Sequence, residues 1–107
     1  MINHNELLIL KIIERFNLSY DIVKIASGKF NILNCSDYLY ILSSSGYIKV
    51  TLDFNNKYEL TEKAMDVLGQ NNSQQIEYLY ATFNNEIQKK YLDIFFDNGA
   101  RPPRDLR

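Results

Sequence analysis

Two short segments decide the predicted fold: YILSSSGYI at residues 40–48 and KYELTEKA at residues 57–64. The first ends a run of helically spaced apolar residues at Gly46, a residue type that commonly ends helices, and then alternates apolar and polar side chains up to Leu52. In the second segment apolar and polar side chains alternate up to Leu60, and Thr61 is then suited to cap a further helix. The polar residues between the two segments favour a turn. We therefore expect a helix, a β-hairpin and a helix over residues 62–68 in direct succession.

Three helices are expected before the hairpin, over residues 6–16, 19–28 and 36–45. In the first, the apolar residues recur at steps of three and four, which is typical of a helix that packs on a core. Polar side chains that can cap the free backbone amides stand at the three starts: Asn5, Ser19, and Asn34 or Ser36.

The last part of the chain predicts one long amphipathic helix from Gln74 to about Phe96. Its apolar stripe consists of Ile76, Tyr80, Phe83, Ile87, Tyr91 and Ile94. Gly99 and the two prolines after it cannot continue a helix. The chain therefore divides into a domain over residues 1–69, a helix over residues 70–98 and a flexible tail over residues 99–107.

Composition favours one folded domain: the chain has 107 residues, of which 46% are hydrophobic and 23% charged. The 12 basic and 13 acidic residues nearly balance, so the sequence lacks the strongly basic character of a nonspecific nucleic-acid binder. A single cysteine, the absence of a signal-like start and the shortness of every apolar run predict a cytoplasmic protein that has no membrane partner.

Residue patterns for catalysis or metal binding are absent from the sequence. It contains no Ser-His-Asp set and no glycine-rich phosphate loop. His4 has no neighbouring ligand, and Cys35 is expected to be a small buried residue. We therefore expect no enzymatic activity and no cofactor.

The two opening segments resemble the end of the recognition helix and the second wing strand of MarR-like and PadR-like transcriptional regulators. The resemblance covers residues 5–68 and implies a mostly α fold with a small β-hairpin, namely a winged helix-turn-helix domain that here precedes the long C-terminal helix. It also implies a DNA-binding homodimer, with the third helix in the major groove and the wing on the backbone. The stripe over residues 76–94 would then hold the dimer together. The alternative is that the long helix folds back along its own domain.

The resemblance and the positions of the polar residues give a candidate set of DNA contacts. Lysines would meet phosphates, and the smaller polar side chains of the third helix would meet base edges. The set is Lys24, Lys29, Asn34, Ser36, Tyr40, Ser44, Lys49, Asn55 and Lys57. The third helix departs from the usual pattern because it has no Arg or Lys for guanine.

This departure leaves a second hypothesis open, a winged-helix module that binds a protein instead of DNA. Tyr is enriched in protein interfaces, and Tyr38, Tyr40, Tyr47 and Phe54 would be the contacts. Asp37 would suit a basic partner. The Asn-, Ile- and Lys-rich composition is typical of a low-GC genome or a phage.

Overall fold

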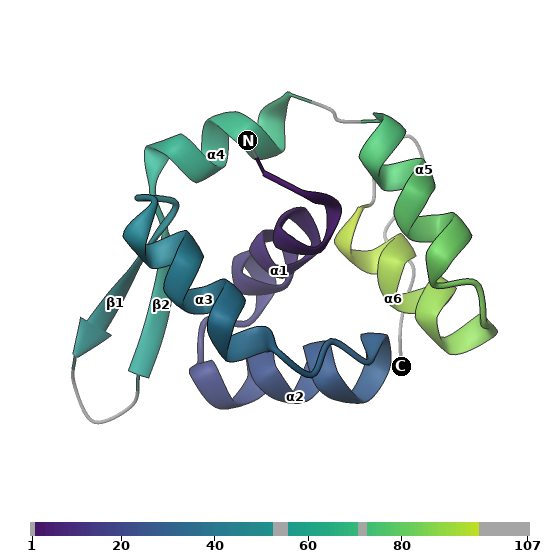
Figure 1. The fold of residues 1–107 in the computed structure, drawn as a ribbon, viewed down its shortest axis with the longest axis horizontal. Helices are drawn as coiled ribbons and strands as arrows, with labels where there is room; N and C mark the ends of the chain where they lie inside the picture. Colours follow the sequence, from purple (N-terminus) through teal and green to yellow (C-terminus); the bar gives the residue numbers. More distant parts are fainter. Residues whose placement is uncertain (1, 53–55, 71–72, 97–107) are drawn as a thin grey trace.

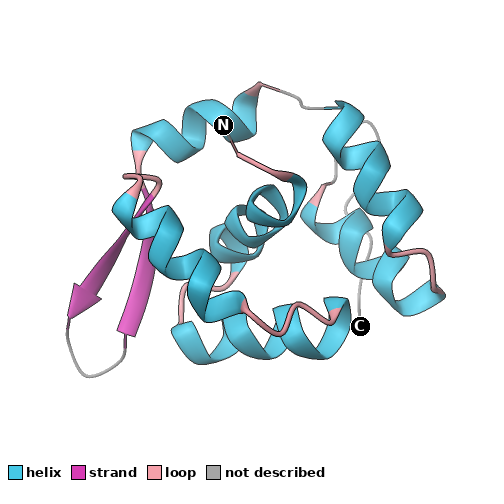
Figure 2. Cartoon of the chain, in the orientation of Figure 1, coloured by secondary structure: helices cyan, strands magenta, loops and turns pink. Residues whose placement is uncertain are grey.

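The computed structural model describes residues 2–52, 56–70 and 73–96. This part of the chain forms six helices and two strands around an apolar core (Figure 1). In chain order they are α1 (His4–Arg15), α2 (Ser19–Phe30), α3 (Cys35–Ser44), β1 (Ile48–Leu52), β2 (Asn56–Leu60), α4 (Glu62–Gly69), α5 (Ser73–Thr82) and α6 (Glu86–Phe95). The prediction of a mostly helical fold with a small hairpin after the third helix is confirmed (Figure 2).

Helix α1 lies at the centre of the molecule and contacts all five other helices (Figure 1). Its residues from Leu7 to Leu10 are all buried, so it is apolar on more sides than the expected amphipathic stripe. Phe16, the last apolar residue of the helix predicted over residues 6–16, is 38% exposed just after the helix ends. The other elements therefore form a layer around a single buried helix.

The hairpin is antiparallel, with Ile48 opposite Leu60 and Val50 opposite Tyr58. Ile48 at its base is buried, Tyr58 and Leu60 pack partly buried against the core, and Val50 is 37% exposed. The turn between α1 and α2 also pairs with β2, because the Tyr58 amide donates a hydrogen bond to the Asn17 carbonyl oxygen at 2.7 Å. The hairpin thus projects from the core but is attached to the α1–α2 turn at the middle of β2.

Several helix ends differ from the predicted ones. The N-cap of α1 is Asn3, not Asn5, because Asn3 and Glu6 form a reciprocal capping box in which the Asn3 side chain accepts from the Glu6 amide at 2.8 Å. Helix α2 continues past Gly28 to the buried Phe30, since Asn31 adopts the left-handed conformation (φ 54°) that ends it.

The structure corrects the prediction of one continuous C-terminal helix. Two helices, α5 and α6, stand in its place, and the chain reverses between Thr82 and Glu86 (Figure 1). Phe83 inserts its side chain into the core, and the Asn85 side chain accepts from the Gln88 amide at 2.8 Å to start α6. This reversal folds the apolar stripe back on the domain, which is the alternative that the amphipathic pattern left open.

None of the helices within the described ranges combines the length and the apolar character that crossing a membrane requires.

Candidate functional site

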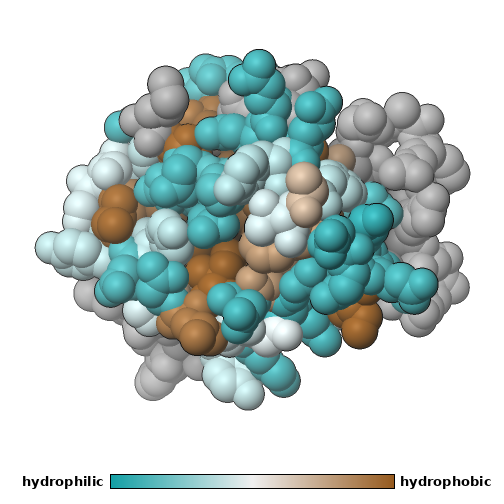
Figure 3. Space-filling model, turned by 45° about the vertical axis from the view of Figure 1, so that its right-hand side comes forward, coloured by the Kyte–Doolittle hydropathy of each residue, from teal (hydrophilic) through white to brown (hydrophobic). Residues whose placement is uncertain are grey.

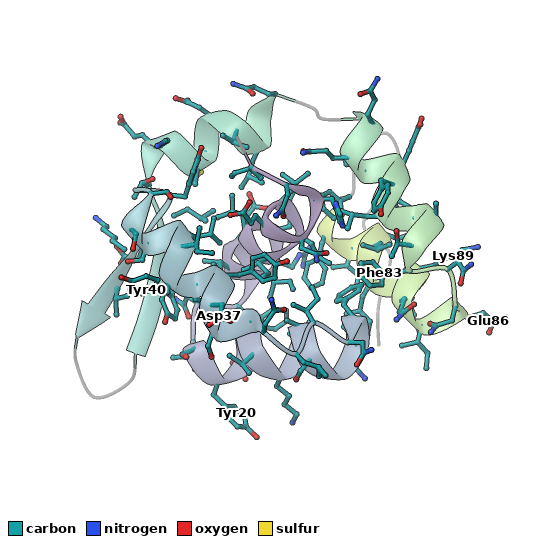
Figure 4. The ribbon with its side chains drawn as sticks, viewed as in Figure 1. Tyr20, Asp37, Tyr40, Phe83, Glu86 and Lys89 are labelled. Carbon is teal, nitrogen blue, oxygen red and sulfur yellow. The ribbon has the colours of Figure 1, made fainter. Side chains whose placement is uncertain are left out.

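The outward side of α3 is the surface on which the sequence places the candidate contacts. Cys35, Leu39 and Leu42 fix the helix to the core, and all three are buried. The opposite side, here called the α3 face, consists of Ser36, Asp37, Tyr40, Ile41 and Ser44, all of which are exposed. Tyr40 is 74% exposed and, with Asp37, points away from the core (Figure 4).

The C-terminal helices leave this face uncovered. Helix α3 packs against α1, α2 and β1, whereas α5 and α6 contact α1 on the side away from the hairpin (Figure 1). A partner therefore has access to α3 and to the neighbouring hairpin at the same time.

The exit of α3 is fixed to the start of α4 by a set of short hydrogen bonds. The Thr61 hydroxyl donates to the carbonyl oxygens of Gly46 and Tyr47, at 2.6 and 3.1 Å. The Lys63 ammonium donates to the Ser45 carbonyl at 2.8 Å and lies 4.5 Å from the centre of the Tyr47 ring. The two sequence segments that predicted the fold are therefore in direct contact, and they set the angle between α3 and the hairpin.

Three of the predicted cationic contacts are exposed lysines of the hairpin and of α2. Lys49 and Lys57 lie on the two strands, and Lys24 lies on α2 with its ammonium 5.7 Å from the Tyr20 ring. The Lys49 ammonium is 3.6 Å from a Glu59 carboxylate oxygen, and about half or more of each side chain is exposed. An exposed pair of this kind weakens the positive charge available to a phosphate.

Other predicted contacts have different locations. Asn34 is exposed at the start of α3, where its carbonyl oxygen accepts from the Asp37 amide at 3.0 Å. Asn55 lies outside the described residues. Lys29 lies at the end of α2, with its ammonium 5.4 Å from the Tyr91 ring on α6. The fold thus brings Lys29 to the C-terminal helices and away from the hairpin.

The predicted dimerisation stripe is mostly directed into the molecule. Phe83 is 9% exposed and its ring centre is 5.1 Å from that of Phe30. Four other members pack partly buried against the core: Ile76, Tyr80, Tyr91 and Ile94. Ile87 differs, at 60% exposed. On the side of the molecule shown in Figure 3, the apolar side chains form separate patches among hydrophilic ones.

Sequence reasoning missed three exposed apolar side chains, one of them on the α3 face. Ile41, one of the apolar residues of α3, is 45% exposed, and Leu33 in the preceding loop is 80% exposed. Tyr20 on α2 is 72% exposed and points outward (Figure 4). Such side chains carry no signal in a helical pattern, because the same spacing also fits a buried position.

Cys35 and His4 are the two residues for which the sequence offered no ligand partners. Cys35 is buried, as predicted, and burial raises the pKa of its thiol to about 11. His4 is half-buried and its ring contacts that of Tyr78, with ring centres 4.3 Å apart and the planes tilted by 46°. Within residues 2–52, 56–70 and 73–96, no three His, Cys, Asp or Glu side chains come together in a way that could hold a metal ion.

Comparison with known proteins gave no match: no family profile, no curated protein sequence and no solved structure is similar to this chain.

Proposed function

We propose that this chain is a winged helix-turn-helix domain that binds double-stranded DNA and acts as a transcriptional regulator. The observation that supports this most strongly is the open α3 face directly beside a projecting hairpin. In winged-helix domains the corresponding helix enters the major groove, and the hairpin follows the flanking backbone.

In this arrangement Ser36, Tyr40 and Ser44 face base edges, and Lys49 and Lys57 face phosphates. Lys24 on α2 supplies a third cation. Each phosphate contact lowers log K by about 0.9 per unit of log salt concentration, so three lysines give a slope of about −3 per copy. We therefore expect DNA affinity to depend only moderately on salt concentration, because the proposal assigns only three lysines to phosphates.

The homodimer stays a prediction, and its interface is not assigned to any surface. The stripe that was expected to form it contributes little free surface, except for Ile87. Two copies on a two-fold operator would place their α3 helices about one helical turn apart. Sedimentation or light scattering of the full chain, alone and with bound DNA, measures whether a second copy is present.

Fluorescence anisotropy of labelled genomic fragments, at two salt concentrations, tests DNA binding directly. The proposal expects salt-sensitive, saturable binding to some of the fragments. Replacement of Lys49 and Lys57 by Ala weakens binding to all sequences alike, whereas Tyr40→Ala and Ser36→Ala change the preference among sequences. Absence of binding to every fragment at low salt contradicts the proposal.

A second candidate function is recognition of a protein, which is favoured by the composition of the α3 face. It has no Lys or Arg, and it combines the acidic Asp37 with the exposed Tyr40 and Ile41. Exposed aromatic side chains are typical of protein interfaces, and a carboxylate repels phosphate. A basic protein surface would satisfy both features.

The same variants separate the two functions. Affinity purification from the native host with the Tyr40→Ala and Asp37→Asn variants shows whether a protein partner depends on the α3 face. The Lys57→Ala variant is the matched control, because a phosphate contact is needed only for DNA. Loss of a protein partner in the first two variants, with normal capture by the third, supports protein recognition over DNA binding.

A further inference from the structure

A groove distinct from the α3 face lies between the ends of α1 and α2 and the side of α6. Its volume is about 430 Å³. Five apolar residues line it and are here called its floor: Phe16, Ile87, Tyr91, Ile94 and Phe95. Three basic residues also line it and are here called its rim: Arg15, Lys29 and Lys90. We call this feature the α6 groove.

The three rim cations are available for an anion. The ion pairs found among the described residues join Lys11 to Glu14 and Lys49 to Glu59, so neither the rim arginine nor the two rim lysines has a carboxylate within 4.0 Å there. Arg15 and Lys29 lie in the last turns of α1 and α2, whose carbonyl ends each carry about half a negative charge. Those two helix ends offset about one of the three positive charges, so the rim remains cationic.

The floor of the groove offers apolar surface beside these cations. Ile87 is 60% exposed and Phe16 is 38% exposed, although both line the groove. The Phe16 and Phe95 rings meet at 81° and the Tyr91 and Phe95 rings at 34°. Rings at such different angles do not form a flat slot, but a flexible chain can follow them.

From this juxtaposition we propose that the α6 groove binds a medium-length alkyl carboxylate. The carboxylate head is held by Lys29, Lys90 and Arg15, and the alkyl chain covers Ile87, Ile94 and the aromatic edges. The volume lies in the range typical of small-molecule pockets, which usually combine an apolar lining with a few polar groups. The site is independent of the DNA or protein partner of the α3 face, because it uses none of the residues of that face.

Calorimetric titration of the full chain with octanoate, and with 1-octanol as the uncharged match, tests this proposal. Octanoate is expected to bind saturably, and octanol at least about tenfold more weakly, because it cannot form charge-assisted hydrogen bonds. The Lys29→Met/Lys90→Met variant keeps the apolar stems and is expected to bind octanoate at least about tenfold more weakly. Both lysines are exposed, so this variant is expected to fold, and its circular dichroism spectrum checks that it does.

The matched control is Lys24→Met/Lys49→Met, which removes the same charge elsewhere on the surface and should leave octanoate affinity unchanged. Methyl chemical shifts of Ile87 and Ile94 should move on titration with octanoate. The proposal is overturned if octanoate does not bind, if octanol binds equally well, or if the two double variants bind octanoate alike.

Discussion

The hydroxyl of Thr61 lies 2.6 Å from the carbonyl oxygen of Gly46, across 15 positions of sequence. The Thr61 hydroxyl oxygen in turn accepts from the Ala64 amide at 3.4 Å, so one side chain both closes the end of α3 and caps the start of α4. The base of the hairpin lies between these two contacts. Together with the Lys63 contact to Ser45, this threonine therefore helps to set the direction in which the hairpin projects beside α3.

Replacing Thr61 by Ala should lower the free energy of unfolding by about 1–2 kcal/mol, because it removes the helix cap. Thr61→Ser keeps the hydroxyl and should lose less than about half of that. Urea denaturation followed by circular dichroism measures both values. Equal losses for the two variants would show that the methyl group, not the hydroxyl, stabilises this junction.

Replacing two glycines by alanine should change the stability of the protein in opposite directions. Gly46 has φ +82°, so Gly46→Ala should cost about 1–2 kcal/mol of stability although no atom lies within 4 Å of the added methyl group. Gly28 lies within α2 and also has free space, so Gly28→Ala should stabilise the protein by about 0.5–1 kcal/mol. Thermal denaturation of both variants gives the two signs, and a shift in the same direction would contradict these backbone conformations.

The reversal between α5 and α6 separates two residues that a continuous helix would place on one stripe. Phe83→Ala should cost about 3–5 kcal/mol, because it empties a buried site beside Phe30. Ile87→Ala should change stability by no more than about 0.5 kcal/mol, because this side chain is 60% exposed. Urea midpoints of the two variants measure the contrast. Similar large losses in both would instead favour a long helix that buries the whole stripe against a second copy.

The elements that the sequence predicted well are those defined by neighbouring residues. Gly46 and Thr61 act within one or two turns of the helices that they end or begin, so α3, the hairpin and α4 can be located from local chemistry. The reversal was missed because the spacing of the apolar residues, at steps of three and four, continues unbroken through Phe83 and Ile87. That spacing is the one expected of a continuous helix. Asn85 followed by Glu86 was the available signal, since both are favourable at a helix start.

The candidate site could be predicted only in part, for a related reason. The exposure of Ser36, Tyr40 and Ser44 follows from their position on one side of a helix whose other side is apolar. The location of Lys29 cannot be predicted in this way, because it depends on α6 folding back against the end of α2. A contact between segments that lie far apart in the sequence leaves no local pattern from which it could be predicted.

The buried thiol of Cys35 predicts a loss of stability at high pH. Burial raises its pKa from 9.0 to about 11 in the folded chain, since the charged thiolate is disfavoured there. The stabilisation that this group provides is complete below pH 9.0 and is lost as the pH rises towards about 11, because only the unfolded chain then releases the proton. Urea midpoints of the native chain and of Cys35→Ala at both ends of this range measure the effect. A difference between the two proteins that stays constant with pH would contradict it.

Removing the charge of Glu59 should strengthen DNA binding if the hairpin lies on the phosphate backbone as proposed. Its carboxylate is 3.6 Å from the Lys49 ammonium, so Glu59→Gln frees that cation and removes a repulsive charge. We expect the dissociation constant to fall about threefold, while stability changes by less than about 0.5 kcal/mol because the pair is exposed. Glu14→Gln is the matched control, since it breaks the Lys11 pair on α1 and changes the net charge equally. If anisotropy titrations show the same gain for both variants, net charge alone explains the effect and the hairpin has no specific contact with the backbone.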